Sequence, residues 1–386
     1  MKSFRRKSAL AFILIVLGSY AFSQINLPIS LIYLPQGIVL DGLSGFGYNE
    51  STSTTISNFN NTNPACIYDF DKFMIGLSYQ YETKIDEAWI AEIGHSRAYP
   101  NFPQSFGFVY SLNSLKLGFG TSQIYNSEKD YGKIERTIIS DNNQDYIDVD
   151  VVYPEKKEIV LRNSFSMAYN LKNLVEIPGN IVVGMRYNFN YLNYKFDMTV
   201  AEESGIDAEI FSSNLSLGIR YDFPESEMPS LKLGMYYDTK TEYKKTKSYF
   251  GEPYRFIGYM PGKLHYGFQL DITKAFYLSG DVAYMFWEKI DRDSNNKLND
   301  IDLSGTFGCY LSKKMNLSLG IYSSVKNYKY VDGIFSLNNM NAQYLICGLL
   351  YSGRHLFFEL VLADSHLLSD EWRKQTVGKF GIGYEF

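Results

Sequence analysis

Apolar and polar side chains alternate along most of this chain, from residue 72 to the C-terminus. The pattern is clear in residues 181–191, where one face carries Ile181, Val183, Met185, Tyr187, Phe189 and Tyr191. The opposite face carries Val182, Gly184, Arg186, Asn188 and Asn190. Successive side chains of a β-strand point to opposite faces, so this period of two predicts strands with one apolar and one polar face. We found no comparable stripe of helical period, and we expect an all-β protein.

The length of these segments separates a soluble sandwich from a membrane barrel. Segments such as 157–170, 181–197 and 206–221 are much longer than the roughly five or six residues typical of soluble strands. A tilted strand needs about 9–11 residues to cross lipid and can continue above it. Aromatic residues form 16% of the chain, and they mark the ends of the apolar faces, where barrels carry aromatic girdles. These features favour a transmembrane antiparallel β-barrel.

The alternation predicts fourteen wall strands, an even number as single-chain outer-membrane barrels require. They are 72–82, 104–112, 115–125, 157–170, 181–197, 206–221, 229–243, 260–272, 275–289, 299–311, 315–326, 341–352, 354–364 and 376–386. Two further extended pieces, 87–97 and 131–153, are expected beyond the wall. If both joined the wall, the count would be sixteen.

Both ends of the chain point to export into an outer membrane. Residues 1–23 combine four basic residues, an apolar run and a small-residue cleavage site, which is the order of a secretory signal peptide. Residues 24–69 precede the barrel (70–386) and are expected to plug its lumen. The last strand ends on Phe386 and looks like the terminal strand that the barrel-assembly machinery recognises. We therefore expect the outer membrane of a Gram-negative bacterium.

Several classes of function are disfavoured by composition. A net charge of −5 without a basic block argues against nucleic acid as a partner. The four histidines are scattered, and no HExxH, GxSxG or CxxC spacing occurs, so we expect neither enzyme activity nor a cofactor. Three cysteines cannot all pair, and we expect Cys309 to face lipid and Cys347 to be buried.

One loop carries a weak calcium pattern. Oxygen-bearing side chains stand at offsets similar to those of an EF-hand loop in residues 291–302: Asp291, Asp293, Asn295 and Asp302. Asn296 replaces the turn glycine, and Asp302 replaces the bidentate glutamate. A solvated acidic loop is the favoured interpretation, with Ca²⁺ as the alternative.

Short motifs in a fixed order resemble a known family. Asn63-Pro64-Ala65 precedes the first strand, and further along Pro261 precedes a strand that contains Gly267. The next strand ends in a Tyr-x-x-Trp pattern, Tyr284 to Trp287. This ordered set resembles the FadL-type transporters, outer-membrane barrels for the uptake of toluene and long-chain fatty acids.

The resemblance implies a monomeric barrel plugged by an N-terminal hatch, which takes up hydrophobic molecules and releases them sideways. In that family a kink in the third strand, beside the NPA triplet, opens the wall. The matching strand here is 115–125, with Gly118 and Gly120 as the expected bend. Cys66-Ile67-Tyr68 departs from the small residues usual after NPA. The loops also look shorter than in the fatty-acid transporters, which leaves a PorV-like role in type IX secretion, or a scaffold role, as the alternative.

Hydrophobic uptake needs an apolar path through the lumen, because each methylene gains about 0.8 kcal/mol on leaving water. Apolar residues are predicted at five lumen-facing positions: Val160, Val182, Met285, Trp287 and Phe357. Packing of the plug against the wall explains any one of them equally well. We expect a hydrophobic small molecule as the ligand, and lipid and lipopolysaccharide around the barrel. A transporter predicts a break in the wall near strand 115–125, whereas a secretion protein predicts a sealed wall.

Overall fold

The computed structural model describes the following parts of the chain: residues 28–29, 50–82, 85–90, 94–98, 102–130, 134–139, 147–152, 154–173, 178–198, 206–224, 229–249, 252–286, 299–325, 342–368 and 376–386. The signal peptide, most of residues 24–49, Trp287, Asp291, Asp293 and Asn295 lie outside these described residues. No helix among the described residues is long and apolar enough to cross a bilayer.

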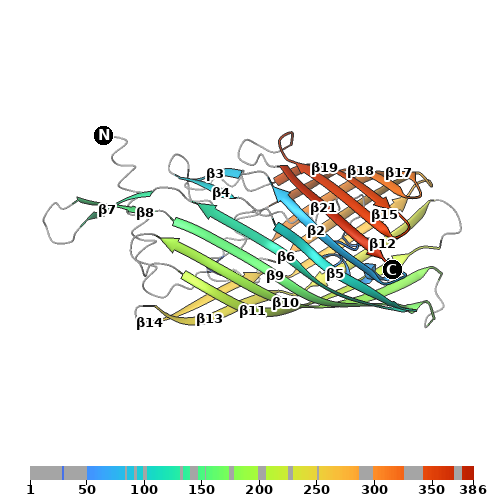
Figure 1. Ribbon diagram of the computed structural model, residues 1–386, viewed down its shortest axis with the longest axis horizontal. Coiled ribbons are helices and arrows are strands. Elements are labelled where there is room, and N and C mark those ends of the chain that lie inside the picture. Colours follow the sequence, from blue (N-terminus) through green and yellow to red (C-terminus); the bar gives the residue numbers. More distant parts are fainter. Residues whose placement is uncertain are drawn as a thin grey trace.

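The fold is a closed barrel of 14 antiparallel strands (Figure 1). Around the wall they are β6 (Leu115–Asp130), β5 (Phe102–Leu112), β2 (Met74–Glu82), β21 (Thr376–Glu385), β20 (Leu356–Asp364), β19 (Ala342–Ser352), β18 (Met315–Val325), β17 (Asp300–Ser312), β16 (Phe276–Met285), β15 (Lys263–Asp271), β12 (Ser230–Asp238), β11 (Ile206–Asp222), β10 (Asn180–Met198) and β9 (Pro154–Asn170). Pairing of β9 with β6 closes the ring. The predicted fold class and all fourteen predicted strands are confirmed.

The remaining strands extend from one end of the barrel, which we call the far end. They are β3 (Ile85–Ile90), β4 (Gly94–Ala98), β7 (Ile134–Ile139), β8 (Ile147–Val152), β13 (Thr241–Tyr249) and β14 (Glu252–Met260). Strand β4 touches the wall through Arg97 opposite Asp130, while β7 and β8 pair only with each other among the described strands. The pieces 87–97 and 131–153 therefore stay outside the wall, and the count is 14 instead of sixteen. The short strand β1 (Pro28–Ile29) pairs with β14, and 3-10 helix η3 (Leu171–Asn173) follows β9.

The two faces of the wall differ as the alternation predicts. On β10, Met185, Tyr187 and Phe189 are exposed on the outside, whereas Arg186 and Asn188 are buried inside. A continuous apolar exterior of this kind is stable only where lipid replaces water. One detail of the prediction was wrong. Cys347 is exposed, because its register partners Leu319 and Leu362 both lie on the outer face of the sheet.

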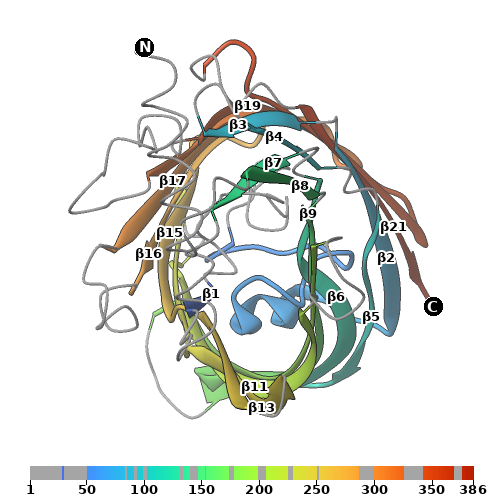
Figure 2. The same cartoon turned by 90° about the vertical axis from the view of Figure 1, so that its left-hand side faces the viewer.

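The end of the barrel opposite the extensions, which we call the hatch end, carries the C-terminus and a cluster of aromatic rings. Phe386 packs against Phe73 with tilted rings and centroids 5.1 Å apart, and the Phe386 amide donates to the Phe73 carbonyl oxygen at 3.0 Å. The last residue thus fastens the last strand to the segment that opens the first. Figure 2, a view along the barrel, shows the segment around η2 (Pro64–Asp69) inside the ring of strands.

The lipid-facing assignment predicts a position-dependent penalty for charge. Leu319 lies in the middle of β18 and is 55% exposed, whereas Leu367 is 79% exposed in a turn beyond β20. Leu319→Lys should lower the free energy of unfolding in lipid bilayers by about 2–4 kcal/mol. Leu367→Lys, the matched control, should change it by about 0.5 kcal/mol or less. Equal effects in equilibrium unfolding from vesicles would contradict a membrane-spanning wall.

Candidate functional site

Besides the two residues of β1, the structure describes residues 50–69 of the predicted plug, and we call this segment the hatch. Hydrogen bonds from its own side chains fix its turns. Asn58 Oδ1 accepts from the Thr55 amide at 2.8 Å and from the Thr54 hydroxyl at 2.9 Å, which closes a turn. Asn63 caps η2, since its Oδ1 accepts from the Ala65 amide at 3.0 Å. Pro64 suits the first helical position, where no amide donor is needed. The NPA triplet therefore has a local structural role.

The same asparagine also joins the hatch to the wall. Asn63 Nδ2 donates to the Ser51 carbonyl oxygen at 2.7 Å and to the Ile219 carbonyl oxygen of β11 at 3.1 Å. Asn63 is fully buried, and a buried amide that loses such partners is costly. The sequence singled out Asn63, Pro64 and Ala65 as a motif, but contained no sign that Asn63 joins the hatch to β11.

Glycines on the inner face of the wall make room for the hatch. A Cβ added at Gly184 would lie 2.2 Å from the Ala65 nitrogen, and one at Gly218 would lie 1.9 Å from Asn63 Oδ1. No side chain fits at such distances without moving the hatch backbone or its anchor. We call the wall positions with this property the glycine seat: Gly76, Gly107, Gly118, Gly120, Gly184, Gly218, Gly234 and Gly383.

Gly118 and Gly120 belong to this seat, and the strand does not open there. Gly118 pairs with Val109 on one side, and Gly120 pairs with Gly107; on the other side both continue the register with β9. Added Cβ atoms would meet the Phe59 ring at Gly118 and the Asn60 amide at Gly120. Strand pairing is therefore continuous at both glycines, and their missing side chains accommodate the hatch.

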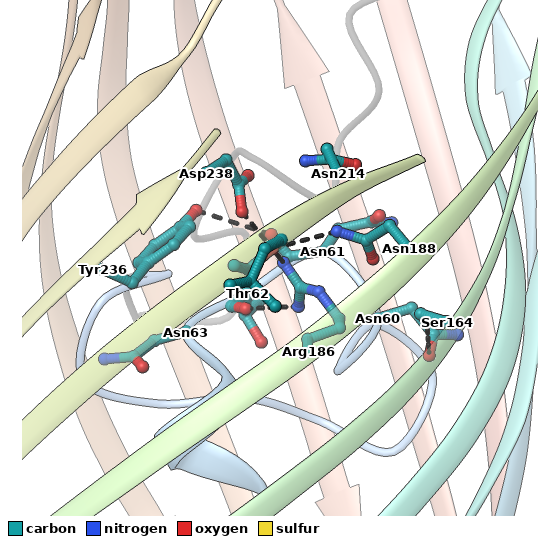
Figure 3. Close-up of polar contacts among 12 residues, drawn as sticks. Asn60, Asn61, Thr62, Asn63, Ser164, Arg186, Asn188, Asn214, Tyr236 and Asp238 are labelled. Carbon is teal, nitrogen blue, oxygen red and sulfur yellow. Dashed lines mark hydrogen bonds and ion pairs between the residues drawn. The ribbon is translucent and has the colours of Figure 1, made fainter. Parts of the chain in front are cut away.

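A buried arginine holds the middle of the hatch (Figure 3). Arg186 Nη1 donates to the Thr62 carbonyl oxygen at 2.6 Å and to the Phe59 carbonyl oxygen at 3.2 Å. Its Nη2 lies 3.5 Å from the Asp238 carboxylate of β12. The side chain is fully buried, so its charge is compensated only by these groups and the neighbouring polar side chains. Arg186 appeared in the sequence only as part of a polar face.

A second arginine holds the end of the hatch. Arg220 of β11 forms a bidentate ion pair with Asp69, with nitrogen–oxygen distances of 2.7 and 2.6 Å, and also contacts Asp222. Burial opposes ionisation of Asp69, but the charge and hydrogen bonds of Arg220 prevail and hold the pKa of Asp69 below its ordinary value. Burial raises the pKa of the nearby Cys66 thiol to about 12, so this thiol stays protonated.

The residues predicted to face the lumen do not form one group in the structure. Val182 and Phe357 pack with the hatch, in a cluster that includes Ile56, Phe59 and Ala65. Val160 belongs to a second group, which we call the far-end apolar cluster: Tyr125, Val160, Leu192, Tyr194, Ala208, Ile210 and Tyr243, with Ile124 and Met260 packed against it.

Two further predicted positions lie elsewhere. Met285 is buried at the end of β16, opposite Lys263 and Asp300. Of the predicted calcium residues, Asp302 is described; it lies within β17, opposite Ala283 and Ser324.

The wall parts between β5 and β6, at a place we call the fork. Among the described residues their pairing ends at Ser105 opposite Ser122. Beyond that point β5 stays with β2, and β6 stays with β9 as far as Asp130. Each strand has a register shift here: β6 between Gln123 and Tyr125, and the β2–β5 pair between Ser78 and Tyr79. The fork lies within the strand where a break was predicted, beyond Gly118 and Gly120.

Unpaired polar atoms accompany the fork. Gln104 Nε2 and Gln123 Oε1 are buried, and neither has a hydrogen-bond partner in the described part of the chain. Pro103, beside Gln104 in β5, has no amide to offer a neighbouring strand. Pro103, immediately before the predicted strand 104–112, was a sequence signal that could have located this place.

Comparison with solved structures shows that this barrel fold is shared with two toluene transporters. No protein-family model and no curated protein matches the sequence. The toluene transporter TbuX of Ralstonia pickettii is 14% identical with a TM-score of 0.58, over 89% of this chain and 97% of that chain. The toluene transporter TodX of Pseudomonas putida is 13% identical with a TM-score of 0.56, over 88% and 96%. The resemblance to FadL-type barrels therefore holds at the level of the fold.

The glycine seat predicts that one added side chain unseats the hatch while the barrel persists. Gly184→Val should make hatch residues accessible to protease, because the valine Cβ overlaps the Ala65 backbone. Gly305→Val is the matched control, since nothing lies within 4 Å of a Cβ at that position. Both variants should still migrate as folded barrels in unheated gels. A hatch equally protected in both variants would show that the seat does not hold it.

Proposed function

We propose that this chain is an outer-membrane channel for the uptake of hydrophobic small molecules, with lateral release through the fork between β5 and β6. The proposal treats the protein as a monomer surrounded by lipid and lipopolysaccharide. The solute would be a small aromatic hydrocarbon, as toluene is for the transporters TbuX and TodX, or a fatty-acid-like molecule. The observation that carries it is the position of the fork beside the far-end apolar cluster.

The two features share residues. Tyr125 follows the register shift in β6 and belongs to the far-end apolar cluster, and Ile124 packs against that cluster. Val160, the β9 partner of Tyr125, is fully buried in the same cluster. An apolar solute that leaves water for this cluster gains about 0.8 kcal/mol per methylene. From there the fork, which begins just before Tyr125 in β6, offers such a solute an exit to lipid.

The groups at the fork suit a wall that opens and closes. Gln104 and Gln123 would be the next register pair if β5 and β6 continued beyond Ser105 and Ser122. One has an unpaired amide donor and the other an unpaired carbonyl acceptor, so closure would let them satisfy each other. On the outer face, the exposed side chains of Phe106 and Leu161 flank the fork. They would give an emerging apolar solute an apolar surface to follow into the lipid.

A disulfide across the fork tests the route. In a chain whose free cysteines Cys66, Cys309 and Cys347 are replaced by alanine, Gln104→Cys with Gln123→Cys would lock the fork shut. Cells carrying this variant should lose uptake of radiolabelled toluene and oleate to the level of cells without the barrel. A reductant should restore it.

The control is a disulfide within the paired part of the same strands, Phe106→Cys with Thr121→Cys, which are register partners. It should leave uptake unchanged. Unchanged uptake in the oxidised fork variant would contradict lateral release there. If neither the native chain nor the cysteine-free chain takes up toluene or oleate, the uptake function is wrong and the secretion or scaffold alternative is favoured.

A further inference from the structure

The hatch begins at a buried group of titratable side chains that the proposed route does not use. Glu50 lies against three wall strands, through Tyr236 of β12, His265 of β15 and Asp281 of β16; we call these four residues the Glu50 cluster. All four are buried. His265 Nδ1 lies 3.5 Å from a Glu50 carboxylate oxygen and 3.6 Å from an Asp281 carboxylate oxygen. One imidazole therefore stands between two carboxyl groups.

Hydrogen bonds at the Glu50 cluster also involve backbone groups of the hatch. The Ser51 amide donates to Asp281 Oδ2 at 3.1 Å, and the Asn63 amide donates to the Glu50 carbonyl oxygen at 2.8 Å. The Tyr236 hydroxyl donates to the Glu50 carboxylate, and its ring stacks on His265 with centroids 4.1 Å apart. Freeing Glu50 would thus loosen the first residues of the hatch without disturbing the Asp69–Arg220 pair at its other end.

We propose that the Glu50 cluster is a proton-dependent latch: proton uptake fastens the start of the hatch to β12, β15 and β16, and proton loss releases it. With both carboxyl groups ionised, two buried negative charges face a single imidazole. Repulsion and desolvation then favour withdrawal of Glu50 into water. This inference concerns the movement of the hatch and holds whatever the barrel carries.

The direction of the pH dependence follows from Glu50 and its surroundings. The pKa of Glu50 is raised to about 7: burial and the charge of Asp281 raise it, and together they outweigh the opposing effects of His265, the Tyr236 hydroxyl and Lys263. A released Glu50 would have an ordinary pKa of about 4.3. The latched state therefore binds the proton more tightly, and its advantage is complete below about pH 4.3 and lost as the pH rises through about 7.

Other charged groups near the cluster do not reverse this direction. Asp238 of β12 is paired with Arg186 of β10, and these two charges interact electrostatically with His265 and Glu50, respectively. Lys263 of β15 brings a positive charge that favours the ionised form of Glu50. Its effect is already contained in the raised value of about 7.

Amide hydrogen exchange of the full chain in lipid nanodiscs tests the latch. After correction for the intrinsic exchange rate at each pH, protection at Ser51 and Thr52 should fall about tenfold between about pH 6 and about pH 8. Amides of η2, held by the Asp69–Arg220 pair, should change by less than about twofold over that range. The proposal would be overturned if amide protection at Ser51 and Thr52 changed together with that of η2, or if neither changed. This test needs no mutation.

Three variants test whether Glu50 is the group whose proton controls release. Glu50→Gln keeps the shape of the protonated side chain, so protection should stay at the low-pH level throughout. Asp281→Asn removes a charge that raises the pKa of Glu50, so the midpoint of release should move to lower pH. Glu359→Gln, a buried carboxyl beside Lys379 elsewhere in the wall, is the matched control and should leave the transition in place. A pH transition that persists in Glu50→Gln would refute the latch.

Discussion

Pairing of β6 with β9 closes this sheet, and the rest of the structure depends on that closure. In lipid no water is available for backbone amides and carbonyls, so a sheet with free edges would be costly and only a closed ring is stable. The pairing runs from Leu115 opposite Tyr169 to Asp130 opposite Glu155. A wall of this kind has few places where it can part. The fork between β5 and β6 is such a place, and we propose that solutes leave the barrel there.

Closure also creates an interior that must be filled. The hatch fills one end by fitting its backbone into the glycine seat and by pairing its polar groups with buried charges. Arg186 and Arg220 stay charged over the physiological range, so the contacts they make with the hatch do not depend on pH. Glu50 is different, because its proton is exchangeable near neutrality. The hatch thus combines a fixed body with a first segment, around Glu50, that can be released. The far-end apolar cluster lies outside the hatch, beside the fork.

Much of this fold was predictable because period-two alternation is a local property. It identified the wall strands, the outward apolar faces and the inward position of Arg186, Asn188 and Asn190. It failed where the outcome depends on contacts between distant segments. A glycine in a strand signals either a bend or a close approach, and only the position of Phe59 and Asn60 decides between them at Gly118 and Gly120. Cys347 was misassigned because residues 344–350 contain no charged or amide side chain, so alternation does not show which face the cysteine takes.

The candidate site was less predictable than the fold. The NPA triplet marked the hatch, but Ile219, which binds Asn63, and Arg186, which binds the neighbouring Thr62, lie far away in sequence and became visible only through strand register. The fork was also hidden, since a bulge adds a single residue and barely disturbs the alternation of Gln123, Ile124 and Tyr125. The Glu50 cluster draws its four members from four separate segments. None of them has a local sequence signal.

The central claim is that an apolar solute passes from the far-end apolar cluster to lipid through the fork while the body of the hatch stays seated. Anomalous diffraction from crystals soaked with a brominated aromatic hydrocarbon tests this directly. The account predicts bromine peaks beside Tyr125 and Val160 and between β5 and β6, with Asn63 still bound to Ile219. Bromine peaks along the barrel axis past a displaced hatch, with none at the fork, would contradict it.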